Sequence, residues 1–123
     1  MRREHSKLEL FNKLQLKDYD DDIIISAITK LADQNYQSDN RFSEAFILMR
    51  YNQGKGPIKI ASELKFRGIS TFDLSDYDWF KSAKEIREKK FGDSSSIDFK
   101  EQAKQKRFLL SRGFGLDQIN QAF

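Results

Sequence analysis

Residues 64–74 read Leu-Lys-Phe-Arg-Gly-Ile-Ser-Thr-Phe-Asp-Leu, and the same order of residue types occurs twice more in the chain. The other copies are residues 14–24, Leu-Gln-Leu-Lys-Asp-Tyr-Asp-Asp-Asp-Ile-Ile, and residues 109–119, Leu-Leu-Ser-Arg-Gly-Phe-Gly-Leu-Asp-Gln-Ile. Each copy holds a leucine, a base, a residue that tolerates the left-handed conformation, an apolar residue, a residue able to cap a helix and a later aliphatic residue. This order is typical of the place where one helix ends and another begins. Recurrence at a period of about 45–50 residues predicts a repeat architecture.

The composition limits the classes of protein to consider. The chain has no cysteine, which removes disulfides, thiol nucleophiles and thiolate zinc sites and fits a reducing compartment. No apolar run approaches the roughly 20 residues that span a bilayer, and residues 1–6 lack the apolar stretch of a signal peptide. We therefore expect a cytoplasmic protein. A net charge of +3 is a mild basic bias, which permits an acidic partner or weak nucleic-acid contact.

Helical signals recur along the chain, whereas strand signals are nearly absent. Ser6 and Glu9 form a capping box that opens the first expected helix, which ends near Asp18. Acids at 20–22 are expected to cap a second helix. The further helices are expected from Asp39 to about Asn52, from Pro57 to Arg67, from a capping-box-like start at Ser70–Asp73 through Arg87, from Asp98 to Gly113, and from about Leu116 onward.

Apolar residues at helical spacing predict the buried faces of these helices. The fold class that follows is all-α, with tandem three-helix repeats that form an elongated, curved, solenoid-like body. The expected division is a partial first repeat at 1–37, a second repeat at 38–91, and a linker with the third repeat at 92–123. Only two helices are visible in the first repeat, so the chain is either naturally short there or a fragment without its N-terminal helix. The expected core residues are Leu10, Phe11, Leu14, Ile24, Ala27, Ile28, Leu31, Phe42, Ala45, Phe46, Met49, Ile60, Ala61, Leu64, Tyr77, Phe80, Ala83, Ile86, Ile119 and Phe123.

The residues that could carry chemistry are few. His5 is the single histidine, and we expect it to be an ordinary exposed residue. The acids at 18–22 lack the spacing of a calcium loop, so helix capping is the favoured interpretation. Gly54–Pro57 leads into a helix as a phosphate cradle would, but a tight helix–helix turn is favoured. We expect no catalytic residue, metal or cofactor, and hence no enzyme.

Basic residues mark a candidate contact surface, although many of them are expected to be ordinary solvated side chains. Aromatic residues are plentiful, with eleven phenylalanines, but most lie on apolar stripes and are expected in the core rather than stacked on bases. Lys104 and Lys106 also belong to this basic set but are not among the predicted contacts. The predicted partner-binding residues are Arg41, Arg50, Lys55, Lys59, Arg67, Arg107 and Arg112.

Three segments, in order, give the chain a family resemblance. The first has Arg3, His5-Ser6, Glu9-Leu10 and Lys13-Leu14. The second holds Tyr36-Gln-Ser-Asp39-Asn-Arg41-Phe42-Ser-Glu-Ala45-Phe46, Arg50, Gly54-Lys-Gly56-Pro57, Ile60 and Glu63-Leu64-Lys-Phe-Arg67-Gly68-Ile69. The third is Lys106-Arg-Phe108-Leu109-Leu-Ser-Arg112-Gly113-Phe114. Together they resemble the RecX regulatory proteins over nearly the whole chain. Asp18 departs from the family pattern, which has glycine at that turn.

The resemblance implies a non-catalytic regulator of the bacterial recombinase RecA. RecX proteins lie in the groove of the RecA filament on single-stranded DNA, block its extension and promote its disassembly, and some bind DNA weakly. By this resemblance the partner is the RecA filament, with no membrane partner, and we expect a monomer. The alternative is a stand-alone helical DNA-binding protein, since residues 113–123 can imitate the turn and recognition helix of a helix-turn-helix. That last helix carries no Lys or Arg, which counts against it.

Overall fold

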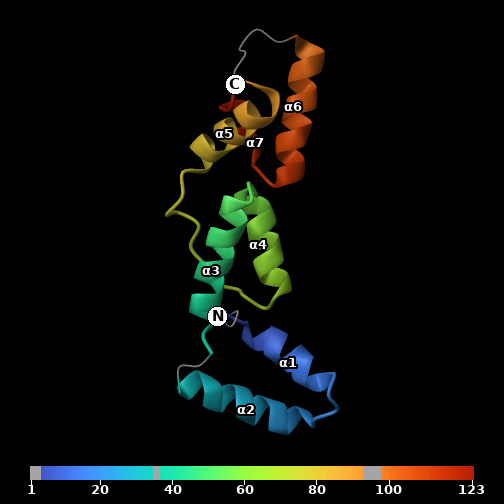
Figure 1. The fold of residues 1–123 in the computed structure, drawn as a ribbon, viewed down its shortest axis with the longest axis vertical. Coiled ribbons are helices and arrows are strands. Elements are labelled where there is room, and N and C mark those ends of the chain that lie inside the picture. The colour runs from blue at the N-terminus through green and yellow to red at the C-terminus, as the bar shows by residue number, and fades with distance from the viewer. Residues whose placement is uncertain (1–3, 35–36, 93–97) are drawn as a thin grey trace. The chain divides into compact units, whose positions relative to one another are not determined.

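The computed structural model describes residues 4–34, 37–92 and 98–123, and within them every regular element is an α-helix. These residues form two compact units: unit 1 comprises residues 1–47 and 63–72, and unit 2 comprises residues 48–62 and 73–123. The prediction of an all-α fold is confirmed. No helix in the described ranges is long and apolar enough to cross a membrane. The helices are α1 (Lys7–Gln15), α2 (Asp21–Asp33), α3 (Asp39–Asn52), α4 (Pro57–Phe66), α5 (Trp79–Phe91), α6 (Phe99–Arg112) and α7 (Leu116–Asn120) (Figure 1).

Unit 1 contains the α1–α2 pair, in which the two helices lie against each other (Figure 1). The capping box expected at the start of α1 is present. The Glu9 amide donates to the Ser6 hydroxyl, and the Ser6 amide donates to the Glu9 carboxylate. Ile24 and Ile28 of α2 are buried, as is the stacked pair Phe42 and Phe46 of α3. Side-chain capping therefore opens α1, whereas Asp20 at the start of α2 makes no side-chain cap bond although acids at 20–22 were expected to cap it. Buried apolar residues instead define the packed faces of α2 and α3.

Some residues of the expected apolar stripes are not buried. The exposed ones are Ala27, Ala45, Met49, Phe80 and Phe123. In α3, Ser43 and Ile47 are buried instead. The helical period was predicted correctly, but the buried face of α3 is rotated toward the residue after each expected position. Periodicity gives the width of a stripe, while neighbouring helices decide which side of it is covered.

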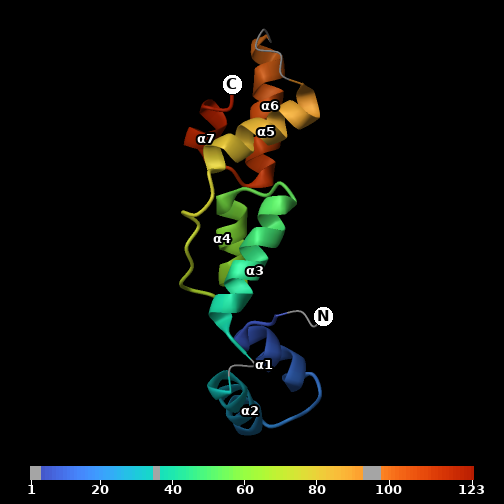
Figure 2. The same ribbon diagram turned by 60° about the vertical axis from the view of Figure 1, so that its left-hand side comes forward.

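Unit 2 contains a three-helix group in which α5, α6 and α7 all contact one another (Figure 2). Its core includes Ala83, Leu109, Phe114 and Ile119, which are almost completely buried. Arg87 is buried with them, and its Nε donates to the carbonyl oxygen of Ala122 at 2.6 Å. The guanidinium of Arg87 therefore holds the last residues of the chain against α5.

The repeated sequence pattern corresponds to helix ends, as predicted. Asp18, Gly68 and Gly113 all have positive φ, of 63°, 83° and 98°. In the second and third copies the residue after the glycine donates back to the leucine at the start of the pattern. These bonds are Ile69 N to Leu64 O at 3.0 Å and Phe114 N to Leu109 O at 3.3 Å. Each is the characteristic bond of a Schellman motif, in which the amide after a left-handed residue donates to a carbonyl five residues earlier and so ends the helix.

The helix expected from Ser70–Asp73 through Arg87 is present as α5, but its predicted start is wrong. Asp73 instead closes a local turn, in which its carboxylate accepts from the Ser75 hydroxyl at 2.6 Å and from the Ser75 amide at 2.8 Å. These two hydrogen bonds lower the pKa of the Asp73 carboxyl below its usual value of 3.8, and the bond from the Ser75 hydroxyl has the larger effect. Helix α5 begins only at Trp79, where Asp78 accepts from the Lys81 amide as the actual cap.

The grouping of helices differs from the repeats expected from the sequence. The expected second repeat, 38–91, included the residues of α5, but α5 contacts α6 and α7. Helix α5 starts at Trp79, later than expected, and packs with the helices that follow it. The linker was expected at the start of the region 92–123, and residues 93–97 of it lie outside the described residues.

Candidate partner-binding surface

Two of the predicted contact residues, Arg41 and Arg67, are tied to acids within unit 1. Arg67 lies within 3.8 Å of Glu9 and 4.0 Å of Glu63, and its guanidinium covers the Phe46 ring at 4.8 Å. Arg41 Nε donates to Glu4 at 3.1 Å. These partners give both arginines a structural role, and Arg67 in particular links α1 to α4.

In unit 1, the end of α4 meets the start of α1 through the Arg67–Gly68 turn. The Ser6 hydroxyl donates to the Arg67 carbonyl at 2.8 Å. A Cβ on Gly68 would lie 2.7 Å from the Cβ of Leu8, so the close approach requires glycine.

In unit 2, the end of α6 meets the start of α4 in the same manner. Gly56 N donates to Arg112 O at 2.7 Å, and Ile58 N donates to Gly113 O at 2.9 Å. A Cβ on Gly56 would lie 2.5 Å from the carbonyl oxygen of Gly113. We call this contact the Gly56–Gly113 joint. The repeated pattern thus both ends a helix and joins it to the start of an earlier one.

The Gly56–Gly113 joint also decides how Gly54–Pro57 is interpreted. A phosphate cradle needs the first amides of α4 to point at a ligand. Here the amides of Gly56 and Ile58 already donate hydrogen bonds to the carbonyl oxygens of Arg112 and Gly113, at the end of α6. The segment is therefore a helix–helix turn, the interpretation that the sequence favoured.

The remaining predicted contact residues lie in unit 2. Arg50 Nη1 donates to Gln53 Oε1 at 2.8 Å near the end of α3, and Lys55 follows in the turn. Lys59 is half-buried at the joint, and Arg107 is exposed on α6. Arg112 lies at the end of α6, with its guanidinium 5.0 Å from the centre of the Phe108 ring.

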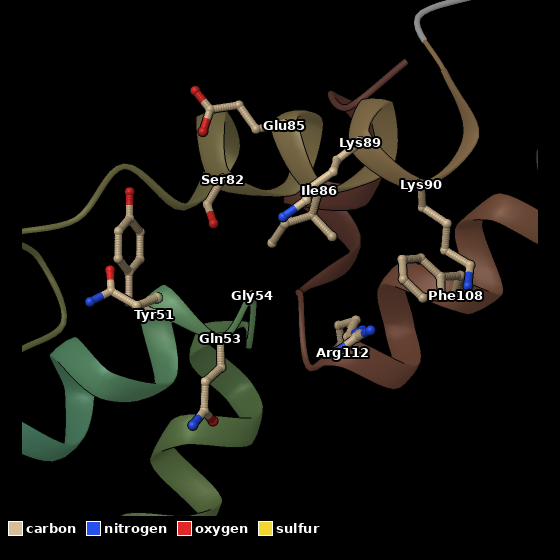
Figure 3. Close-up of a pocket in the computed structure, with 11 residues that line it drawn as sticks. Tyr51, Gln53, Gly54, Ser82, Glu85, Ile86, Lys89, Lys90, Phe108 and Arg112 are labelled. Carbon is tan, nitrogen blue, oxygen red and sulfur yellow. The ribbon is translucent and has the colours of Figure 1, made fainter.

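Arg112 also borders a cleft of about 530 Å³ formed by the end of α3, by α5 and by α6, all within unit 2 (Figure 3). Three cations line it, since Lys89 and Lys90 of α5 join Arg112. The Lys90 ammonium lies 4.7 Å from the centre of the Phe108 ring, and Phe91 meets that ring edge-on at 5.3 Å. We call this feature the basic cleft.

The opposite part of the basic cleft differs in chemistry. Figure 3 shows Tyr51, Ser82 and Glu85 on one side and Lys90, Phe108 and Arg112 on the other. Glu85 is the cleft's acid and pairs with Lys81 at 3.9 Å outside it. The cleft is consequently polarised, with positive charge concentrated at its α6 side.

Sequence reasoning found Arg112 but missed Lys89 and Lys90. A signal was available in the pair of adjacent lysines in the last turn of a helix, where cations are favoured by the helix dipole. What could not be read from the sequence was that α5 packs against α6, because α5 was assigned to the preceding repeat.

Metal binding and the helix-turn-helix reading receive no support from the described part of the chain. No group of three or more potential metal ligands occurs in it, and the acids after Asp18 stand at the start of α2. Helix α7 has five residues, buries Ile119 and carries Asp117 in its first turn. It therefore offers no cation to a phosphate backbone.

Comparison with known proteins identifies the family. Residues 38–74 match the second three-helix domain of RecX, and residues 76–123 match the third. The chain is 40% identical over 125 residues to the regulatory protein RecX of Acinetobacter baylyi, covering 98% of this chain and 79% of that protein. The chain belongs to the RecX family. RecX of Legionella pneumophila is 39% identical over 128 residues, covering 99% of this chain and 85% of that protein. The crystal structure of RecX from Lactobacillus salivarius matches with a TM-score of 0.81 and 26% identity, covering 98% of this chain and 84% of that one.

The third-domain RecX match covers the three-helix group of unit 2. The third-domain match takes in α5, α6 and α7 together, starting ahead of α5, whereas the third repeat expected from the sequence starts at residue 92. The arginine–glycine pairs of the RecX resemblance, Arg67-Gly68 and Arg112-Gly113, are the turns that join helices in each unit.

Proposed function

We propose that this RecX-family chain modulates the recombinase RecA, mainly as an inhibitor, by binding in the groove of the RecA filament on single-stranded DNA. Binding there blocks filament extension or promotes disassembly. The observation that carries the proposal is family membership over nearly the whole chain.

The contact surface that we propose lies on unit 2. Arg41 and Arg67 are held by carboxylates of their own unit, which lowers their value to a partner. The remaining predicted contacts are Arg50, Lys55, Lys59, Arg107 and Arg112. Attraction between these cations and acidic subunit surfaces would speed association and weaken with salt.

The experiment that tests the function measures ATP hydrolysis by RecA on single-stranded DNA while this chain is added. We expect dose-dependent inhibition. Charge reversal at half-buried Lys55 and exposed Arg107, Lys55→Glu with Arg107→Glu, should weaken inhibition about tenfold and leave the helical circular dichroism unchanged.

Two results would contradict the proposal in different ways. No inhibition at saturating chain would refute RecA modulation. Full inhibition by the reversed variant would instead remove Lys55 and Arg107 from the contact surface. A matched control reverses Lys13 of α1, which lies in unit 1 and outside the proposed surface.

A further inference from the structure

We infer that the basic cleft of unit 2 binds a short acidic peptide segment of a partner protein, one that places carboxylates next to an apolar side chain. The inference concerns the ligand chemistry of one cleft, and it rests on the proposed function only for which protein supplies the segment. Three observations carry it: the charge arrangement, the occupied aromatic ring, and the mixed lining of the cleft.

The charge arrangement favours carboxylates at the α6 side. Lys89, Lys90 and Arg112 line the cleft, whereas the carboxylate of Glu85, the acid in the lining, points away from Lys90 and Arg112 in Figure 3 and pairs with Lys81. Arg112 is half-buried, so its interaction with a carboxylate is less screened than that of a fully exposed base. Its planar guanidinium also matches a carboxylate in geometry.

The Phe108 ring disfavours nucleic acid as the occupant. Single-stranded nucleic acid uses aromatic faces to stack bases. Lys90 and Arg112 both lie over this ring, at 4.7 Å and 5.0 Å from its centre, and Phe91 contacts it edge-on. A base would have to displace these cations, whereas a carboxylate binds them where they are.

The rest of the lining suits a peptide. Ile86 lies between the two sides of the cleft and offers an apolar contact, with Gly54 close by: a Cβ there would lie 3.4 Å from the Ile86 side chain. Figure 3 shows the Tyr51 hydroxyl and the Gln53 amide across the cleft from α6. Such groups can bond a peptide backbone. From the α6 side across, the cleft therefore presents the cations, then the apolar Ile86, and then the polar groups of Tyr51 and Gln53.

The single tryptophan provides a direct readout of binding. Trp79 is the only tryptophan in the chain and is buried. Its ring lies edge-on to Tyr51, with centres 5.6 Å apart, so a ligand that moves Tyr51 changes the Trp79 environment. The assay titrates the full chain with the peptide Glu-Glu-Leu-Glu-Glu, its glutamine counterpart and a thymidine decanucleotide, and follows Trp79 fluorescence.

Variants of the cleft sharpen the test. Lys89→Glu with Lys90→Glu should weaken acidic-peptide binding about tenfold, and the milder Lys89→Gln with Lys90→Gln about threefold, while Glu85→Gln should strengthen it about twofold. The matched control is Lys84→Glu, an exposed lysine of the same helix that does not line the cleft, which should change binding less than twofold.

Each outcome bears on the inference. Binding of the acidic peptide that is lost with the glutamine counterpart and with the cleft variants supports it. The inference is overturned if the peptide does not bind, if both peptides bind equally, if Lys84→Glu weakens binding as much as the cleft variants, or if the decanucleotide binds the cleft more tightly. A chain that inhibits RecA without binding the peptide refutes the cleft alone, and one that binds the peptide without inhibiting RecA refutes the proposed function alone.

Discussion

Replacing Gly113 by alanine tests whether the Gly56–Gly113 joint stabilises unit 2. Gly113 has a φ of +98°, which costs an alanine about 1–2 kcal/mol of backbone strain. Its new Cβ would also collide with the Cβ of Lys59 and lie 2.8 Å from the Lys59 amide nitrogen. Since the backbone of α4 cannot rotate away as a flexible side chain could, the start of α4 must shift.

The shift would stretch the bonds from Gly56 N to Arg112 O and from Ile58 N to Gly113 O. Each such bond contributes about 0.5–1.5 kcal/mol. Together with the backbone strain, we expect Gly113→Ala to lower the free energy of unfolding by about 2–5 kcal/mol.

Gly92 supplies a control that has backbone strain without a collision. Its φ is +86° and its ψ is 176°, a conformation that essentially only glycine adopts, and a Cβ there would meet no described residue within 4 Å. Gly92→Ala should therefore cost only backbone strain, about 1–3 kcal/mol. The assay is urea unfolding followed by circular dichroism, where the extra loss at Gly113 should move the midpoint by about 1 M or more. Equal losses in the two variants would refute the reasoning, since the joint would then contribute nothing.

Three other predictions concern packing, ion pairs and pH. Leu64 is fully buried and Phe66 is 83% exposed, so Leu64→Ala should cost about 2–5 kcal/mol and Phe66→Ala less than about 0.5 kcal/mol in urea unfolding; equal effects would show that the packing face of α4 is wrong. Arg67→Glu should lower the free energy of unfolding by about 1–2 kcal/mol, because it replaces two ion pairs by repulsion, and an unchanged midpoint would contradict that role. The folded-state pKa of Asp73 is lowered, so its turn is favoured above pH 3.8 and weakens as the pH falls through the folded pKa. The amide signal of Ser75 should titrate with a midpoint below 3.8, and a midpoint at or above that value would count against the turn.

Helix starts and ends with local causes were predictable from the sequence. Ser6 with Glu9, and Asp98 with the Glu101 amide, form caps within four residues of the chain, so their signals are complete in the sequence. The end of α6 at Gly113 has an equally local cause in the left-handed conformation that glycine adopts freely.

The start of α5 could not be predicted in the same way. Asp73 and Asp78 are both able to cap a helix, and a sequence pattern does not choose between them. The structure selects Asp78, because Asp73 binds Ser75 and the Trp79 indole donates to the Leu74 carbonyl at 2.8 Å. Those bonds fix the chain before α5 in a non-helical path.

The residues of the candidate site were likewise only partly predictable from the sequence. The sequence identified Arg67 and Arg112 as equals, since both are arginines before a glycine in the repeated pattern. In the structure Arg67 is held between two glutamates, while Arg112 borders the basic cleft with Lys89 and Lys90. Which cations face a partner depends on which acids lie within a few ångströms, and that distance is not encoded in spacing along the chain.

The sequence by itself determined the all-α class, the repeated helix ends and the RecX family, because caps, left-handed turns and family motifs are short-range patterns of residue type. Only the tertiary structure decided that α5 joins α6 and α7, that the α3 face is turned toward Ser43 and Ile47, and that a basic cleft forms in unit 2. These features arise from contacts between residues far apart in the chain, where burial and charge are settled by neighbours rather than by period.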